Sequence, residues 1–210
     1  MNSITSYARI KNNSVFVNGT LVFSADTNLN ITEFLSEAYK KLSISYPKYH
    51  KMDTLCKLGF LCAEFAIQNT PFLEANNLDS IGIVLSNSSS SLQTDILHQN
   101  SISNKEAYFP SPAIFVYTLP NIIIGEIAIK HKITGENAFF VSEKFDSELI
   151  TNYCEMLLQN NTTALVSGWV EINETNYDAF IFLTERKENI NKNTIFKPLN
   201  KQIVTELYNT

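Results

Sequence analysis

The run Ser80-Ile-Gly-Ile-Val-Leu-Ser86 decides the class of fold that this sequence predicts. It is short, apolar and rich in β-branched residues, which is typical of a strand buried in a sheet that is covered on both faces. Helical patterns precede it and follow it along the chain. Strands that alternate with helices indicate an α/β domain with a mixed sheet between helix layers.

Two helices are expected before this run. Residues 30–43 form the first, because Asn30 is a suitable N-cap and Glu33 is placed to complete a capping box. Residues 52–68 form the second, whose sparse charges predict burial. Gly59 lies inside this helix and costs about 1 kcal/mol relative to alanine. A close contact with another helix or with the sheet would explain the glycine.

The segment before these helices favours strands. Residues 15–23 hold Asn18-Gly19 between two β-rich runs, and Asn-Gly in that setting is a strong hairpin signal. After the central run, residues 87–91 form a serine-rich loop that leads into a short helix through His98. The backbone N–H groups and hydroxyls of this loop suit either an anion or an ordinary polar turn.

The second half of the chain continues the alternation of helices and strands. The apolar residues 113–130 predict a long buried helix, which Pro120 kinks or restarts. The elements expected after it are a short strand, a helix and two antiparallel strands, at residues 139–142, 146–160, 163–172 and 177–184. The composition shifts near Arg186. We therefore expect one α/β domain over residues 1–186 and a polar C-terminal tail over residues 187–210, with a docked helix at 198–208.

The composition bounds the function. With 44% hydrophobic and 18% charged residues, 210 residues suffice for one domain with a sizeable core. A net charge of −5 argues against nucleic acid, which calls for a basic patch. No apolar stretch is long and uninterrupted enough to span a membrane, and the start of the chain does not resemble a signal peptide. We therefore expect a soluble, cytoplasmic protein.

The residues that usually carry chemistry are few. The three cysteines, Cys56, Cys62 and Cys154, are read as buried small side chains rather than as a disulfide framework. The three histidines have no metal-binding spacing, and the sequence contains no phosphate-binding or dinucleotide-binding motif. We expect no metal and no cofactor. The residues alone predict a soluble α/β domain.

Four segments, taken in order, resemble the N-terminal half of β-ketoacyl synthases, which are condensing enzymes of the thiolase fold. They are Val15-Phe-Val-Asn-Gly-Thr-Leu-Val-Phe-Ser24, Tyr49-His-Lys-Met-Asp-Thr-Leu-Cys-Lys-Leu-Gly-Phe-Leu-Cys-Ala-Glu64, residues 111–130 and Gly135-Glu-Asn-Ala-Phe-Phe-Val-Ser142. Residues 164–171 are similar to the next strand of the family. The resemblance implies half of a thiolase-like fold, a mixed β-sheet covered by helices, whose first strand runs on through Gly19. The shorter ketosynthase-like proteins of aryl-polyene and related pigment pathways fit the length best.

The departures from this family concern its catalytic residues. In the family, Val-Ser is followed after one residue by the nucleophilic cysteine, whereas here Ser142 is followed by Glu143 and then by Lys144. Lys144 therefore matches the nucleophile. The two catalytic histidines of the family come from its C-terminal half, which the resemblance does not cover. Condensation needs an acylated thiolate, an oxyanion site and histidines, so the resemblance implies a protein that does not catalyse it.

The leading hypothesis is a non-catalytic ketosynthase-like accessory subunit in fatty-acid or polyketide-type biosynthesis. It would be chain-length-factor-like or would interact with a carrier protein. Its partners would be a full-length ketosynthase, an acyl carrier protein or a second copy. In this family the strand before the nucleophile pairs across a two-fold axis, and residues 139–142 would be that strand. The pocket or interface candidates are Phe115, Tyr117, Asn121, Phe139 and Phe140.

Two other functions stay open. Lys144 near a helix N-terminus would be an amine nucleophile of an enzyme with different chemistry, or simply a solvated lysine. The apolar side chains around Phe115, Tyr117 and Phe140 would line a pocket for an acyl ligand, or belong to the core. Half of a thiolase-type fold also exposes the face that packs on the other half. The tail after Arg186 or a second subunit is expected to cover that face.

Overall fold

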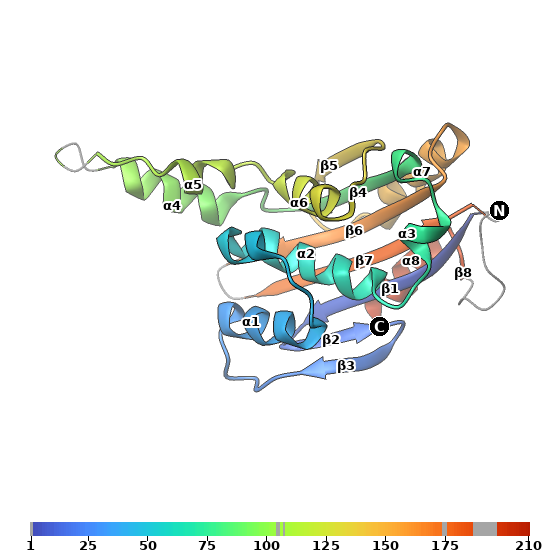
Figure 1. The fold of residues 1–210 in the computed structure, drawn as a ribbon, viewed down its shortest axis with the longest axis horizontal. Helices are drawn as coiled ribbons and strands as arrows, with labels where there is room; N and C mark the ends of the chain where they lie inside the picture. The colour runs from blue at the N-terminus through green and yellow to red at the C-terminus, as the bar shows by residue number, and fades with distance from the viewer. Residues whose placement is uncertain (1, 104–105, 107, 174–175, 187–196) are drawn as a thin grey trace.

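A computed structural model describes residues 2–103, 106, 108–173, 176–186 and 197–210 (Figure 1). Its strands are β1 (Ser3–Lys11), β2 (Ser14–Val17), β3 (Thr20–Ser24), β4 (Ile81–Asn87), β5 (Asn137–Val141), β6 (Ala164–Ile172), β7 (Tyr177–Glu185) and β8 (Lys197–Pro198). Its α-helices are α1 (Ile31–Leu42), α2 (Thr54–Ile67), α3 (Phe72–Ala75), α4 (Leu92–Ile102), α5 (Pro112–Val116), α6 (Ile122–His131), α7 (Ser147–Gln159) and α8 (Lys201–Asn209). Short 3₁₀ helices occur at Pro47–Lys51 and Leu78–Ser80.

The strands form one mixed sheet in the order β3-β2-β1-β7-β6-β4-β5, with β8 paired to β1. β4 is parallel to both of its neighbours, β5 and β6, and the other pairs are antiparallel. All seven residues of β4 are buried. The prediction of a buried strand at residues 80–86 in an α/β fold with a mixed sheet covered by helices is therefore confirmed.

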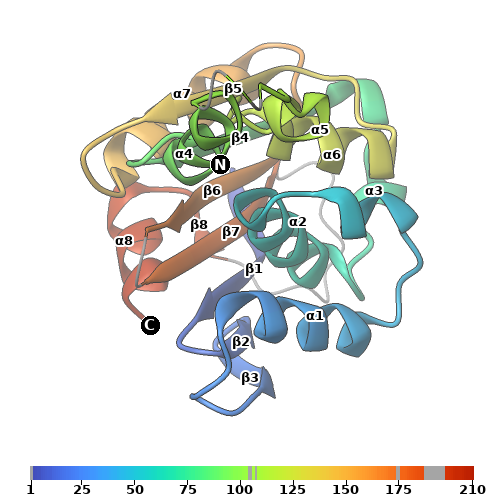
Figure 2. The same ribbon diagram turned by 90° about the vertical axis from the view of Figure 1, so that its left-hand side faces the viewer.

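Helices cover both faces of this sheet (Figure 2). The helices α1, α2 and α6 pack on one face, against side chains that include Ile83, Val166 and Ile181. The helices α7 and α8 pack on the other face, where Phe180 and Phe182 are fully buried. The two faces thus hold two separate apolar clusters.

The two helices predicted before β4 are confirmed. Asn30 caps α1, and both hydrogen bonds of the capping box with Glu33 are present. Asp53 caps α2 by accepting the backbone N–H of Cys56 at 2.8 Å. A Cβ atom on Gly59 would lie 2.8 Å from a methyl carbon of Ile123 on α6 and 3.2 Å from Val170 on β6. The close contact expected at this glycine is therefore present on both sides.

The hairpin at residues 15–23 is confirmed as β2 and β3. Asn18 and Gly19 both have positive φ, at 52° and 79°, as a two-residue hairpin turn requires. The prediction from the family resemblance that one strand runs on through Gly19 is therefore wrong, because the chain reverses direction there. The first long strand is β1, for which the sequence pattern gave no expectation.

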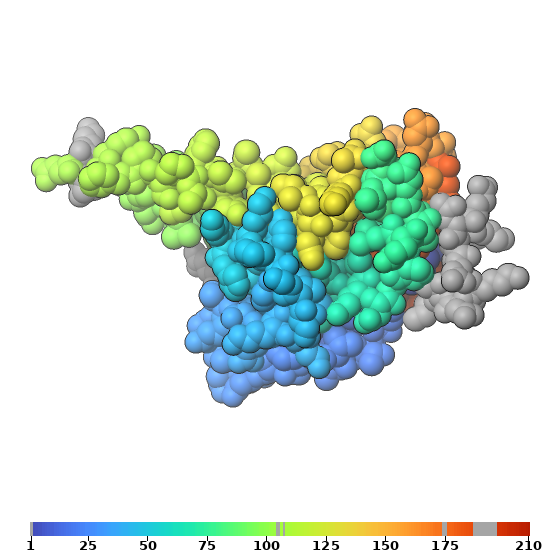
Figure 3. Space-filling view, in the orientation of Figure 1, coloured from blue at the N-terminus to red at the C-terminus, as the bar shows by residue number. Residues whose placement is uncertain are grey.

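The new helix expected after Pro120 is confirmed as α6, but the first part of the predicted helix at residues 113–130 is short and is not buried. The chain forms the short helix α5, turns at residues 117–121, and begins α6 at Ile122. No residue of α5 is buried, whereas α6 buries three isoleucines. The helices α4 and α5 pack on each other and form an arm, residues 92–103 and 108–119, that extends away from the sheet (Figures 1 and 3).

The elements expected after the arm are confirmed as β5, α7, β6 and β7, and β6 and β7 are antiparallel neighbours. The helix expected at residues 198–208 is α8. Residues 187–196 of the expected tail lie outside the described residues, so the domain division at Arg186 stays a prediction. Over the part of the chain that the structure describes, no helix is long and apolar enough to cross a membrane.

Candidate functional site

The carboxyl ends of the parallel strands β5, β4 and β6 meet at one edge of the sheet. The strands end there at Val141, Asn87 and Ile172, and the loops that follow them are neighbours. Ligands of open α/β sheets bind at such an edge. The candidate residues Ser142, Glu143 and Lys144 and the serine-rich loop all lie at this edge.

The loop after β5 contains Lys144, which the sequence resemblance predicts at the position of the nucleophile. The backbone N–H of Ser142 donates to the carbonyl of Asn87 at 2.9 Å, and its hydroxyl donates to the carbonyl of Lys144 at 2.9 Å. The side chains of Glu143 and Lys144 are exposed and make no hydrogen bond or ion pair with another described residue. Ser142 therefore fixes the loop, and Lys144 extends into solvent.

The first turn of α7, just after Lys144, is already occupied. The carboxylate of Asp146 accepts the backbone N–H groups of Glu148 and Leu149 at 3.0 and 2.9 Å. These donors would otherwise be available to an anion at the helix N-terminus. Asp146 thus caps α7 and satisfies these donors within the chain.

The serine-rich loop after β4 is occupied in the same way. The backbone N–H groups of Ser88 and Ser89 donate to Glu171 Oε2 at 2.6 and 3.1 Å. The other carboxylate oxygen of Glu171 is buried and has no hydrogen-bond partner among the described residues. Ser91 donates to the carbonyl of Thr118 at 2.6 Å. The carboxylate of Glu171 therefore occupies the place where an anion could bind to this loop. The loop thus has a structural role.

The three thiols are not placed to act as nucleophiles. Cys56, Cys62 and Cys154 are all free and buried. Burial raises the pKa of the Cys154 thiol to about 12, although a contact with the Ser167 hydroxyl at 3.1 Å partly opposes this. Burial likewise raises the pKa of Cys56 and of Cys62 above its ordinary value. A nucleophilic cysteine needs a lowered pKa and access to substrate, so these residues are structural.

The five pocket or interface candidates are not gathered in one place. Phe139 and Phe140 alternate on β5, so Phe139 packs toward the α1–α2 cluster and Phe140 toward α7. Phe115 is exposed on the arm, and Tyr117 packs against the α1–α2 cluster after α5. Asn121 is the N-cap residue of α6. None of the five lines the cavities described next.

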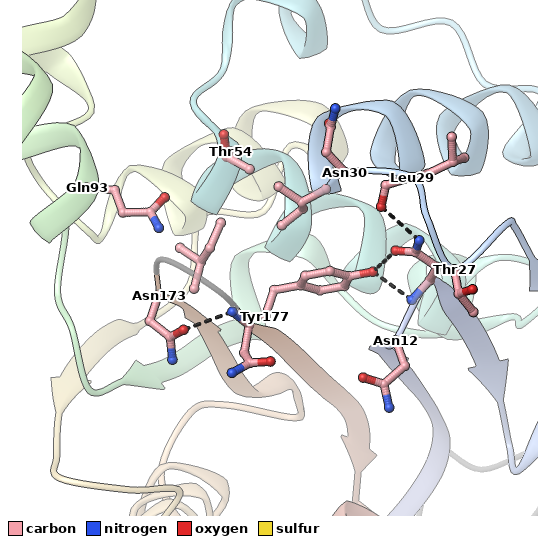
Figure 4. Close-up of a pocket in the computed structure, with 12 residues that line it drawn as sticks. Asn12, Thr27, Leu29, Asn30, Thr54, Gln93, Asn173 and Tyr177 are labelled. Atoms are coloured by element: carbon pink, nitrogen blue, oxygen red, sulfur yellow. Dashed lines mark hydrogen bonds between the residues drawn. The ribbon is translucent and has the colours of Figure 1, made fainter.

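A cavity of about 550 Å³ opens between the β1–β2 turn, the first turns of α1 and α2, and the β6–β7 turn (Figure 4). None of the described residues that line it is charged. Asn13 forms part of it: its backbone N–H donates to the Tyr177 hydroxyl at 2.7 Å, and its amide donates to the carbonyls of Asp26 and Leu29 at 2.7 and 3.0 Å. Cavities of about 460 and 130 Å³ adjoin it at Gln93 and Ile172. No motif marks these residues in the sequence, because they come from turns and helix starts far apart along the chain.

The histidines have structural surroundings. His131 Nε2 on α6 lies 2.5 Å from Glu64 Oε1 on α2, and both side chains are nearly buried. His98 packs against the ring of Phe115 within the arm, with ring centres 5.3 Å apart. Among the described residues, no group of three or more His, Cys, Asp or Glu side chains is arranged to hold a metal ion.

No protein-family model matches the sequence, and no curated protein matches it either. Solved structures do share its fold. A type II polyketide acyl carrier protein in complex with its ketosynthase aligns with a TM-score of 0.64 and 12% identity, over 93% of this chain and 65% of that chain. A ketosynthase in complex with its chain length factor, from Xenorhabdus doucetiae, aligns with a TM-score of 0.56 and 14% identity, over 89% of this chain and 79% of that chain.

A β-ketoacyl synthase from Burkholderia phymatum aligns with a TM-score of 0.63 and 10% identity, over 89% of this chain and 59% of that chain. This chain thus spans less than two thirds of the length of the first and third of these structures. At such low identity the likeness concerns the fold. The chain has the fold of these ketosynthase structures, a thiolase-like fold.

Proposed function

We propose that this chain is a non-catalytic ketosynthase-like accessory subunit that binds another ketosynthase-fold chain through the edge strand β5. The observation that carries the proposal concerns β5: the loop that follows it and its open edge. The loop after β5 has lysine in place of the family's cysteine, and the N–H groups beside it are held by Asp146. The strand itself is left open to a partner.

The open edge of β5 suits strand pairing. β5 pairs with β4 on one side and with no described strand on the other. Its sequence is Asn-Ala-Phe-Phe-Val, and the terminal Val141 is 58% exposed. An exposed apolar edge strand favours association, and pairing across a two-fold axis would satisfy its free backbone groups.

The arm, which follows β4, the strand paired with β5, provides further apolar surface. Eight of the thirteen exposed large apolar side chains among the described residues lie on it: Leu92, Ile96, Leu97, Tyr108, Phe109, Phe115, Val116 and Leu119. Residues 88–121 contain only three charged side chains, Asp95, Lys105 and Glu106. An apolar surface of this kind marks a protein interface. The partner should present an apolar surface beside a free strand.

Two of the similar structures are complexes that suggest the class of partner. One joins a ketosynthase to its chain length factor, and another joins a ketosynthase to an acyl carrier protein. The accessory subunit would be chain-length-factor-like, and its partner a full-length ketosynthase, with an acyl carrier protein recruited to the complex. Its pathway would be of the fatty-acid or polyketide type.

Co-purification of the tagged chain from its native host, with mass spectrometry, tests this proposal. We expect a ketosynthase in near-stoichiometric amount. Val141→Lys should remove it, because a charge then lies on the pairing edge, while Leu21→Lys should retain it, because Leu21 is exposed on β3 at the opposite edge of the sheet. A chain that purifies as a monomer would overturn the proposal, and a homodimer would assign the partner to a second copy.

A second candidate function is a binding module for a small uncharged ligand. The cavity of about 550 Å³ favours it, since the described residues that line that cavity are uncharged. This location differs from the acyl pocket expected around Phe115, Tyr117 and Phe140. A thermal shift with uncharged acyl thioesters of varied chain length would support this function, and its absence in Thr54→Trp would place the ligand in the cavity.

A further inference from the structure

The C-terminal helix α8 lies on the same side of the sheet as α7 (Figure 2). Its residues Val204 and Leu207 are completely buried and join a cluster that includes Phe180 and Phe182. The ring of Tyr208 lies against Phe145 and Phe180. α8 therefore covers β7 and its neighbour β1, whereas α7 covers β6 and β4.

A buried charge ties α8 to the sheet. Arg9 on β1 is nearly inaccessible, and its guanidinium lies 4.0 Å from the centre of the Tyr208 ring and donates to the Tyr208 carbonyl. The same guanidinium forms an ion pair with Asp178 on β7 at 2.9 Å, and the Tyr208 hydroxyl donates to Asp178 at 2.7 Å. A buried arginine that loses partners is strongly unfavourable. Arg9 therefore requires α8 to be in place.

The rest of α8 is fixed at its start and along α7. The backbone N–H of Leu199 donates to the carbonyl of Asn2 at 3.0 Å, next to the β1–β8 pair. The hydroxyls of Thr205 and Ser147 lie 2.7 Å apart, and Lys201 pairs with Glu148 at 2.5 Å. These contacts join α8 to β1 and α7 along its length. A loosely attached tail would not have them.

We propose that α8 is the chain's own closing element for this face of the sheet, in place of the second α/β half that half of a thiolase-like fold would otherwise need. The face is then complete within one chain. Any partner binds at β5 and the arm and leaves the α7–α8 face unchanged. The statement about where a partner binds rests on the proposed function. The statement that α8 closes this face does not.

Hydrogen exchange of the intact chain, alone and with the co-purified partner, tests this. We expect the amides of α8 to exchange as slowly as those of β1 and β7, and partner binding to slow exchange in β5 and the arm only. Rapid exchange throughout α8 in the intact chain would overturn the inference. So would partner-induced protection of β1, β7 and α8, and in that case the accessory-subunit proposal would still stand.

Point variants test whether the packing of α8 on the sheet is independent of partner binding at β5. Leu207→Ala should accelerate exchange in α8 and β1 at least tenfold, and Gln202→Ala, on the exposed face of α8, should leave both unchanged. Leu207→Ala should keep its partner while Val141→Lys loses it. Loss of the partner by both variants would contradict the separation of the two surfaces. If the wild-type chain has no partner, the proposed function fails, and the exchange rate of α8 still decides the closure.

Discussion

The carboxylate of Glu171 accepts the backbone N–H of Ser88 at 2.6 Å, which links the end of β6 to the loop after β4. Ser89 donates to the same oxygen at 3.1 Å. Two backbone donors that would suit an anion are thus satisfied by a side chain 82 and 83 residues away. This contact satisfies both donors at the carboxyl edge of the sheet without a bound anion.

Glu171→Ala should destabilise the protein by about 1–3 kcal/mol, because it leaves both N–H groups without their acceptor. Urea unfolding followed by circular dichroism measures this. Glu171→Gln is the matched control: its amide oxygen can still accept, so the loss should be smaller. An alanine variant as stable as the wild type would show that water replaces the carboxylate at no cost.

Gly59 and Gly125 both lie in helices, the first at a crowded position and the second at an open one, so alanine substitutions at the two can be compared. Alanine at Gly59 should destabilise by about 1–3 kcal/mol, because its Cβ would lie 2.8 Å from Ile123. Alanine at Gly125 in α6 should stabilise by about 0.5–1 kcal/mol, because nothing lies within 4 Å of its Cβ. Thermal melting of the two variants compares them directly. Equal effects of the same sign would contradict the close contact at Gly59.

Lys144 should behave as an ordinary surface lysine. It makes no contact that would activate an amine, so borohydride trapping with a short aldehyde should label it no faster than the exposed Lys41. Lys144→Met should change the free energy of unfolding by less than about 0.5 kcal/mol. Peptide mass spectrometry gives the labelling rates. Selective labelling of Lys144 would instead favour an enzyme that uses this amine.

The three thiols should be unreactive in the native protein. Burial raises their pKa, so a thiol reagent at pH 8 should modify them only after unfolding. The unfolded thiols have a pKa of about 8.5. Their stabilising contribution is therefore complete below that pH and is lost as the pH rises toward the folded value, about 12 for Cys154. Unfolding free energies at pH 8 and 10 should fall less in Cys154→Ala than in the wild type.

The elements that the sequence predicted correctly have strong local signals. The capping box of Asn30 and Glu33, the Asn18-Gly19 turn and the β-branched run of β4 each depend on neighbours in the chain. The strand β1 was missed because its sequence, Ser-Ile-Thr-Ser-Tyr-Ala-Arg-Ile-Lys, mixes polar and apolar residues, yet seven of its nine residues are buried. Its burial comes from strands and helices distant in sequence.

The errors in the candidate site have a related cause. Residues 113–130 are apolar, and an apolar pattern shows neither where a helix breaks nor whether it faces core or solvent, so Phe115 was placed in a buried helix. The pair of Glu171 and Ser88 and the contact of Arg9 with Tyr208 join residues 83 and 199 positions apart. No local pattern reports such contacts. The lysine at position 144 was identified only through the family resemblance.

The exposed apolar surface of the arm affects how much unassembled protein a cell can accumulate. Its aromatic tip, where Phe109 is 79% exposed, is the kind of surface that chaperones and proteases recognise in unassembled chains. If the proposed partner covers the arm, copies made in excess of it would be removed, since exposed apolar surface marks them for degradation. Synthesis in step with the partner, as from one shared transcript, would keep each new copy covered.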